Sequence, residues 1–507
     1  MQSSHHSWGK AFSAFKDRRV VIMFFLGFSA GIPLLLIFSS LSLWLGEAGI
    51  ERKAVTFFSW AALGYSFKFV WAPLIDELPF PVLTKLLGRR RSWLLVAQIA
   101  IACSIMLMAF TDPTQGPDSL VQMAIGAVLL GFSAATQDVV IDAYRIELAD
   151  VNLQTALAAT YNAGYRVGMI LAGAGALYFA SWYGSDKGNY LYEAWRTTYL
   201  IMASAMLVGI VTTLVIREPK QSKPPRPYHS MDYFRLVFVF VMAVTGFVGT
   251  FLLLGDALDF GQKLDPFMAF LVEAARLFGS LFAAVLIGYS LVKCGAVNRK
   301  MAYETWVEPV ADFFSRYGIK SAVLLLLLIG LYRISDIVAG VISNVFYQDL
   351  GFTKPEIATA VKTFGVIVTI AGGFAGGLLA ERYSVMKILM LGAILSSLTN
   401  LIFIGLAHAG HDMVWMYAAV TADNLASGLA GAAFVAFLSS LTNVSFTAVQ
   451  YAIFSSLMTL IPKVLGGYSG TVVDAVGYPT FFLGTTLLGI PVLFLIVLVD
   501  RSLRSRP

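Results

Sequence analysis

Near its start the chain carries VVIMFFLGFSAGIPLLLIFSSLSLWL, Val20–Leu45, a run in which no residue is charged. A helix needs about 20 apolar residues to cross a hydrocarbon core of roughly 30 Å. Similar apolar stretches recur as far as Val499, and 58% of the 507 residues are hydrophobic while only 13% are charged. A soluble core has no place for so much apolar surface, so the sequence predicts an all-α membrane protein.

The apolar stretches predict fourteen membrane crossings. They lie at residues 20–45, 55–75, 92–111, 119–143, 156–182, 195–216, 234–256, 266–292, 320–347, 357–380, 384–407, 413–441, 447–474 and 478–499. The first one has no small-residue cleavage site, so it is expected to stay as a helix and not to be removed as a signal sequence.

The distribution of basic residues gives the orientation. Most of the 36 Lys and Arg residues lie in segments predicted to be cytoplasmic. The predicted outer loops hold only Arg52, Lys53, Lys187, Arg196, Lys263 and Lys354. Because basic residues concentrate on the cytoplasmic side, both termini are predicted to be cytoplasmic.

The crossings divide into six, an inserted pair and six. Residues 1–216 are predicted to form one six-helix bundle and residues 320–507 a second. Residues 217–319 would supply the linker REPKQSKPPRPYHS (Arg217–Ser230), two additional crossings and an amphipathic connector. Two related bundles around a central pathway are typical of secondary transporters.

Signatures of other classes are absent from the sequence. Cys103 and Cys294 lie in or beside apolar helices and imply no disulfide, and the five histidines lie in tails or loops, so no metal site is predicted. No phosphate-binding Gly-Lys-Ser or Gly-Lys-Thr loop occurs. An enzyme, a cofactor and a nucleic-acid partner are therefore not expected, and transport would draw on an ion gradient.

Ionisable residues inside the predicted crossings carry the functional prediction. Each costs roughly 2.5–3.5 kcal/mol to insert, so such groups usually face a bundle interior or a watery cavity. The set contains the cations Arg166, Arg333, Lys463 and Lys362 and the acids Asp138, Asp336, Asp423 and, near the cytoplasmic mouth, Asp142.

Two interpretations of these charges stay open. Arg333 and Asp336 are three positions apart, so they either neutralise each other as a structural pair or act on substrate. Arg166 and Lys463 have no acidic neighbour in their own helices, and at least one of them is predicted to contact an anionic substrate. Tyr165, adjacent to Arg166, suits sugar stacking or a polar contact. Asp138 and Asp423 are candidates for reversible protonation, and the alternative for Asp138 is a structural bond to a neighbouring helix.

The cytoplasmic face carries a separate group of charges. Lys68 lies near the cytoplasmic end of the second predicted crossing, and Asp76 and the run Arg89, Arg90 and Arg91 follow it. They are predicted to act as a gate latch and a topology signal, not as ligands.

Eight motifs resemble one transporter family. They are GFSAGIPLLLIFSSLSLWL (Gly27–Leu45), FKFVWAPLID (Phe67–Asp76), GRRRSWLL (Gly88–Leu95), SAATQDVVIDAY (Ser133–Tyr144), YRVGM (Tyr165–Met169), YRISD (Tyr332–Asp336), DNLASGLAGAAFVAFLSSLTN (Asp423–Asn443) and TAVQYAIFSSL (Thr447–Leu457). Together they resemble the anhydromuropeptide permeases (AmpG type) of the major facilitator superfamily. The match covers both halves of the chain.

The resemblance implies a fold, a substrate and a membrane. It implies the major facilitator fold in the inner membrane of a Gram-negative bacterium. It also implies proton-driven import of GlcNAc-1,6-anhydro-MurNAc, with or without its stem peptide, from the periplasm into the cytoplasm. It further implies a role in peptidoglycan recycling and, indirectly, in β-lactamase induction and antibiotic resistance.

The resemblance also implies a set of functional residues. By matching motifs these are Gly27, Gln137, Asp138, Asp142, Tyr165, Arg166, Arg333, Asp336, Asn344, Lys362, Asp423 and Asn424. The chain departs from the family pattern at Glu77, where a basic residue is usual, and members differ in where the additional helix pair sits. A role for the central pair therefore does not transfer.

Two other functions fit the same sequence. One is a carrier of another bulky anion, such as an acyl-CoA-like or peptide substrate, and the other is a membrane sensor without transport. Fourteen-helix peptide carriers share the central pair, but the charged cluster of their first helix is missing here. A monomer in contact with lipid, substrate and protons is the expected state.

Overall fold

The computed structural model describes residues 14–37, 39–50, 65, 67–150, 153–185, 188–219, 228–257, 266–466 and 468–504. These residues are almost entirely helical, as the apolar runs predict. The chain forms two compact units. The first contains Met1–Ile75, Pro79–Lys220 and Tyr317–Pro507, and the second contains Asp76–Leu78 and Gln221–Arg316.

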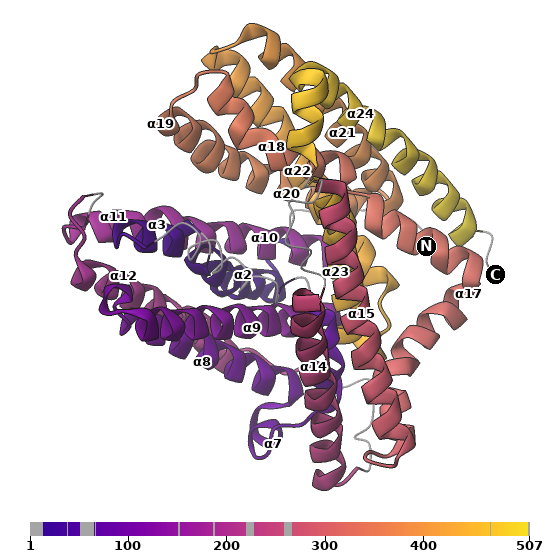
Figure 1. The fold of residues 1–507 in the computed structure, drawn as a ribbon. Helices are drawn as coiled ribbons and strands as arrows, with labels where there is room; N and C mark the ends of the chain where they lie inside the picture. Colours follow the sequence, from indigo (N-terminus) through magenta and orange to yellow (C-terminus); the bar gives the residue numbers. More distant parts are fainter. Residues whose placement is uncertain are drawn as a thin grey trace. The chain divides into compact units, whose positions relative to one another are not determined.

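The N-terminal helices of the first unit surround two apolar core clusters. α8 packs against both α9 and α12 (Figure 1). The helices are α2 (Arg18–Ile37), α3 (Ser39–Glu47), α6 (Ala72–Glu77), α7 (Leu83–Leu87), α8 (Arg89–Ala109), α9 (Pro117–Leu148), α10 (Gln154–Ile170), α11 (Ala176–Trp182), α12 (Tyr192–Ala205) and α13 (Leu207–Val215). A π-helical turn, η5 (Leu171–Gly175), joins α10 to α11.

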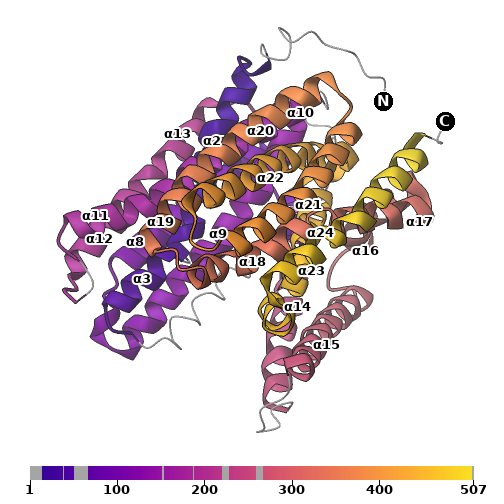
Figure 2. The ribbon, with the colours of Figure 1, turned by 90° about the horizontal axis from the view of Figure 1, so that it is seen from above.

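The C-terminal helices of the first unit form a second group. α22 packs against α20 and α21, and α24 packs against α18 and α21 (Figure 2). The helices are α17 (Glu308–Leu331), α18 (Ile334–Asp349), α19 (Lys354–Ile357), α20 (Gly365–Arg382), α21 (Val385–Ala409), α22 (Met413–Leu441), α23 (Thr447–Gly466) and α24 (Ser469–Arg504). A π-helical stretch, η7 (Ala358–Phe364), joins α19 to α20.

The second unit is built on one helical hairpin. Its helices α14 (Ser230–Ala257) and α15 (Pro266–Lys293) lie side by side (Figure 1), and α16 (Arg299–Ala302) follows them. Arg276 on α15 donates a hydrogen bond of 2.7 Å to the carbonyl of Phe251 on α14, and its guanidinium lies 3.8 Å from the centre of the Phe251 ring. This cation–π contact joins the two helices.

Twelve helices in the described residues are long and apolar enough to cross a membrane. Of the fourteen predicted crossings, the one at 55–75 lies largely outside the described residues. The one at 156–182 is helical throughout, from α10 through η5 to α11, but its apolar character is too low for it to be among the twelve. Arg166 lies within this helix and lowers its mean hydropathy.

Two glycines mark the ends of predicted crossings. Gly318 (φ 65°, ψ 154°) breaks α17 just before the crossing predicted at 320, and Gly477 (φ 77°, ψ 164°) breaks α24 between the last two predicted crossings. Positive φ is readily adopted only by glycine, so a glycine at each of these positions is the sequence feature that permits the turn.

The closest helix contact in the N-terminal group is between α2 and α10. A Cβ atom placed on Gly27 would lie 2.1 Å from the carbonyl oxygen of Tyr161, and one on Gly164 would lie 2.0 Å from that of Phe24. Only glycine permits backbones to approach so closely. Gly27 therefore positions α10, the helix that carries Tyr165 and Arg166.

Candidate functional site

Arg333 lies at a break in a membrane-crossing helix. α17 ends at Leu331 and α18 begins at Ile334, and Arg333 between them is the N-cap residue of α18, with non-helical dihedral angles (φ −99°, ψ 16°). Interrupted helices of this kind line binding sites in secondary transporters, because the unpaired backbone groups at the break must face protein or water and not lipid.

The predicted pairing of Arg333 with Asp336 is present. The guanidinium forms a short ion pair with the Asp336 carboxylate and also donates to the hydroxyl of Ser427 on α22, at 3.1 Å. Asp336 lies in the first turn of α18, where the helix dipole favours a negative charge. The Asp336 carboxylate is therefore stabilised both by the Arg333 guanidinium and by the N-terminal end of α18.

Two further predicted residues lie on α22. Asp423 interacts electrostatically with Arg333 and Asp336. Asn424 accepts a hydrogen bond of 2.7 Å from Thr369 on α20. The C-terminal group thus brings Arg333, Asp336 and Asp423 into one polar cluster.

Arg166 occupies a different environment on α10. No hydrogen bond or ion pair joins its side chain to any of the described residues. Its electrostatic neighbours are Arg333, Tyr165 and Asp336, so it lies within range of the C-terminal polar cluster. The π-helical turn η5 follows α10 directly, and such turns occur often at functional sites.

Asp138 lies on α9 in the same group of helices and is 9% exposed. The hydroxyl of Tyr161 on α10 lies 3.5 Å from its carboxylate, at the limit of a hydrogen bond. The neighbouring Gln137 is fully buried, and neither polar atom of its amide has a partner among the described residues. A buried amide without a partner is unusual in a folded protein.

Two predicted ligands, Lys362 and Lys463, lie outside this cluster. The side chains of Lys362 and Lys463 are exposed on the protein surface. Lys362 lies in the π-helical stretch η7, and Lys463 lies in the last turn of α23. The side chain of Asn344 lies outside the described part of the structure.

Charged groups at the C-terminal end of α9 form a network that the sequence predicted only in part. The Lys68 ammonium lies 3.8 Å from the Asp142 carboxylate, which is also 3.5 Å from Arg145. Arg145 is fully buried and donates to the hydroxyl of Ser439 on α22, at 2.8 Å. Asp76 is buried as well. Arg145 and Ser439 were not predicted.

The predicted basic run Arg89–Arg91 contacts two residues that were not predicted, Glu147 and Thr447. Arg90 forms an ion pair of 2.6 Å with Glu147 on α9 and donates to the hydroxyl of Thr447 on α23, at 2.7 Å, while Arg89 lies 3.7 Å from Glu147. The hydroxyl of Thr447 in turn donates to Glu147. The spacing of Asp142, Arg145 and Glu147 along one helix was the sequence signal that could have indicated these charge contacts. No sequence signal indicated the contact with Thr447.

Arg91 and Glu218 complete the start of α8. Arg91 donates to the carbonyls of Thr213 and Leu214 at the end of α13. The Glu218 carboxylate accepts the backbone N–H groups of Arg90 and Arg91, at 2.8 and 3.1 Å, and so satisfies two free donors of the helix end. Burial raises the pKa of the Glu218 carboxyl group above its ordinary value.

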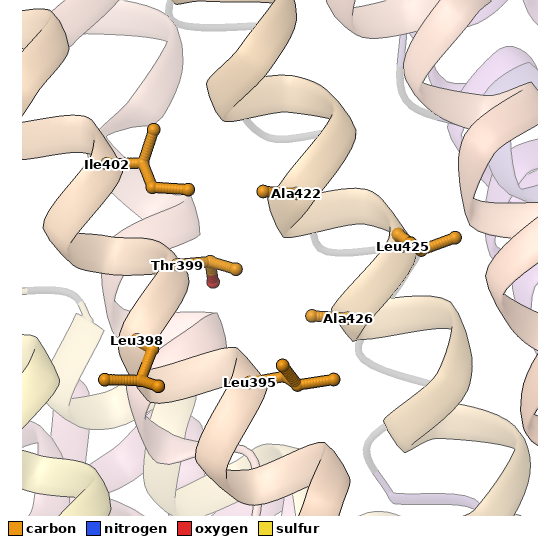
Figure 3. A pocket seen from close by; sticks show the side chains of 7 residues that line it. All are labelled: Leu395, Leu398, Thr399, Ile402, Ala422, Leu425 and Ala426. Carbon is orange, nitrogen blue, oxygen red and sulfur yellow. The ribbon is translucent and has the colours of Figure 1, made fainter.

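A cavity of about 310 Å³ lies between α21 and α22 (Figure 3). Its lining is apolar except for one hydroxyl and consists of Leu395, Leu398, Thr399, Ile402, Ala422, Leu425 and Ala426. It offers no charged group to a polar cargo. Among the described residues no cluster of three or more His, Cys, Asp or Glu residues suits a metal ion.

Comparison with solved structures identifies the fold. The fucose transporter FucP in its outward conformation matches with a TM-score of 0.57 at 12% identity, covering 95% of this chain and 97% of that one. The human organic anion transporter MFSD10 matches with a TM-score of 0.56 at 13% identity, covering 94% and 99%. At these identities the likeness concerns the fold alone, and that fold is the major facilitator fold.

Comparison of sequences identifies the family. The family model described as Major Facilitator Superfamily matches residues 20–303. The anhydromuropeptide permease of Escherichia coli K12 is 30% identical over 491 residues, which covers 96% of this chain and 81% of that protein. A putative transporter AmpG 4 of Rickettsia felis is 30% identical over 488 residues and covers 96% and 98%. The chain is a transporter and not an enzyme, and it belongs to the anhydromuropeptide permease (AmpG-type) family of the major facilitator superfamily.

Proposed function

We propose that this chain imports anhydromuropeptides, GlcNAc-1,6-anhydro-MurNAc with or without its stem peptide, from periplasm to cytoplasm across the bacterial inner membrane, for peptidoglycan recycling. The observation that carries the proposal is the state of Arg166. It is a cation within the crossing predicted at 156–182, it has no hydrogen-bond or ion-pair partner among the described residues, and it lies in electrostatic range of Arg333 and Asp336 from the other helix group.

The chemistry of the cargo supports this role for Arg166. Anhydromuropeptides carry peptide carboxylates, or a lactyl carboxylate when the peptide is absent. A guanidinium holds a carboxylate by two charge-assisted hydrogen bonds, which are about twice as strong as neutral ones. Arg166 would take the carboxylate, and Tyr165 and the unpartnered amide of Gln137 would contact the sugar. Lys362, Lys463, Asn344 and Asn424 are further proposed contacts.

Proton coupling rests on Asp138 and Asp423. Asp138 forms no ion pair within 4 Å among the described residues; the Tyr161 hydroxyl lies at 3.5 Å, and its electrostatic neighbours are Lys68 and Asp142. Asp423 borders the Arg333–Asp336 pair, so a change in its charge alters the field at that pair. A proton on either acid would favour substrate binding, and its release would follow opening to the cytoplasm. Asp336 and Asp142 are secondary candidates for the same role.

The mechanism proposed is alternating access. Contacts between the two helix groups, Arg90 with Thr447 and Arg145 with Ser439, join segments predicted to be cytoplasmic. This supports a state that is closed toward the cytoplasm, in which Arg89, Arg90, Lys68 and Asp142 serve the gate. Breaking these contacts would open the inner side and release cargo and proton.

Uptake into proteoliposomes tests the proposal. Labelled anhydromuropeptide is offered to purified protein under an imposed pH gradient, with and without a protonophore, and the stem peptide is varied from none to full length. Accumulation that needs the gradient and ends with the protonophore is expected. Facilitated uptake without gradient dependence would refute the coupling, and accumulation of a different bulky anion in place of muropeptide would refute the cargo.

A further inference from the structure

Phe15 lies just before α2 and contacts the C-terminal group of helices. The centres of the Phe15 and Phe374 rings are 5.3 Å apart, and the ring planes are inclined by 58°. Phe374 belongs to α20. The contact therefore joins a segment that precedes the first crossing to a helix far along the sequence.

Gly377 provides the space for this contact. A Cβ atom on Gly377 would lie 3.1 Å from the Cζ atom of Phe15 and 3.3 Å from the Cβ atom of Ala159 on α10. The ring of Phe15 thus lies where α10 and α20 meet, beside Gly377, which has no side chain to occupy that space. The cytoplasmic ends of both helices are predicted to lie at this point.

A helix cap fixes the position of Phe15. α2 begins at Arg18, and Asp17 accepts the backbone N–H of Arg19 at 2.8 Å, as an N-cap residue does. The Asp17 carboxylate also forms an ion pair with the Arg19 guanidinium at 2.8 Å. The turn that carries Phe15 is therefore anchored to α2 and not to α20.

Alternating access would require the contact between Phe15 and α20 to break. Opening toward the cytoplasm must separate α10 from α20, and Phe15, which is anchored to α2, would move away from Phe374 and Gly377. The aromatic contact exists only while the cytoplasmic side is closed. A contact made in one of two states shifts the population toward that state.

We propose that Phe15 is a wedge that stabilises the cytoplasm-closed state and must leave Phe374 and Gly377 for transport to proceed. The proposal rests on the proposed alternating-access function. Phe15 is a positioning residue, because it touches neither substrate nor proton site.

Spin-label distances test the wedge without reference to any cargo. Labels on cysteines at the exposed positions Leu86 and Lys387 report the separation of the two cytoplasmic sides, in a background with Cys103→Ser and Cys294→Ser. Phe15→Ala should raise the ratio of cytoplasm-open to cytoplasm-closed protein by about tenfold, as loss of an aromatic contact predicts. Phe15→Leu should restore most of the closed population.

The matched control is Phe25→Ala. Phe25 lies on α2, is 43% exposed, and stacks edge-on against Phe24 within its own helix. Its removal should leave the distance distribution unchanged. An unchanged distribution for Phe15→Ala, or an equal shift for Phe25→Ala, would overturn the wedge.

Crosslinking gives a second test with a transport readout. In the same background, Phe15→Cys and Phe374→Cys are bridged by a short bifunctional methanethiosulfonate reagent, and dithiothreitol later cleaves the bridge. Uptake should fall at least about tenfold when bridged and recover on cleavage, because the wedge can no longer leave. Full uptake by completely bridged protein would overturn the proposal. Should the unbridged protein fail to take up muropeptide, the proposed cargo fails, while the spin-label test still decides the wedge.

Discussion

The two helix groups differ in the partners of their arginine side chains, Arg333 and Arg166. In the C-terminal group, Arg333 is paired with Asp336 and hydrogen-bonded to Ser427. In the N-terminal group, Arg166 has no such partner among the described residues. An unpaired cation in a membrane is costly, and a paired one much less so. The difference indicates that Arg333 stabilises the site, whereas Arg166 is available to bind a ligand.

The two acids do not differ in this way. Asp423 has Arg333 and Asp336 as electrostatic neighbours, and Asp138 has Lys68 and Asp142, with the Tyr161 hydroxyl at 3.5 Å. The two helix groups therefore differ in their arginines and not in these acids.

The largest effect is expected from Asp138→Asn. It removes the proposed proton carrier of the N-terminal group, so accumulation driven by a pH gradient should fall by at least about 100-fold, while exchange of labelled for unlabelled cargo falls much less. Both are measured in proteoliposomes. The control is Asp118→Asn in the first turn of α9, which should transport normally. Full uphill accumulation by Asp138→Asn would remove this residue from the coupling role.

Arg333→Gln should chiefly affect stability. It leaves the Asp336 carboxylate without its counter-charge. Because the pair is partly buried, the loss should be below the value for a fully buried pair, about 1–3 kcal/mol in the free energy of unfolding. Denaturant titration in detergent measures the change. The double variant Arg333→Gln with Asp336→Asn should recover most of the loss, because no charge is left unpaired. Equal instability of the single and double variants would contradict a structural pair.

Arg166→Gln should affect binding and leave stability intact. Loss of a charge-assisted contact should raise the KM for uptake by about tenfold. The melting temperature should stay equal or rise, because a charge that repels Arg333 is removed. Arg196→Gln, which removes an exposed arginine paired with Glu193, is the control. A large fall in melting temperature with an unchanged KM would reverse the contrast between the two arginines.

The smallest expected effect on stability concerns the N-terminal ends of α8 and α21. Glu218 caps α8, whereas Ser384 at the start of α21 makes no capping bond among the described residues. Because the pKa of Glu218 is raised in the folded protein, the folded state binds this proton more tightly than the unfolded state. Its contribution to stability is greatest below the ordinary pKa and diminishes as the pH rises through the folded value.

Glu218→Gln should remove that pH dependence. The difference in unfolding free energy between wild type and variant should change by less than about 1 kcal/mol between pH 5 and pH 7.5, with wild type relatively more stable at pH 5. Melting curves in detergent at the two pH values measure it. A wild type that gains stability relative to the variant as the pH rises would contradict the sign.

Much of the fold followed from the sequence, because the cost of exposing apolar or backbone polar groups to the wrong solvent leaves few solutions. Apolar runs predicted the helices, and Gly318 and Gly477 mark the predicted ends of crossings. The spacing of Arg333 and Asp336 predicted their ion pair. Spacing within one helix fixes which side chains can meet, so such pairs are readable without a structure.

Only the tertiary structure decided which distant groups meet. The sequence did not indicate that Glu147 meets Thr447, that Arg145 meets Ser439, or that Phe15 fills the space beside Gly377. It also did not indicate the helix break at Arg333. Such contacts depend on how whole helices pack, which sums many weak interactions over the chain, whereas the hydrophobic runs and charge pairs are local and are determined by the sequence itself.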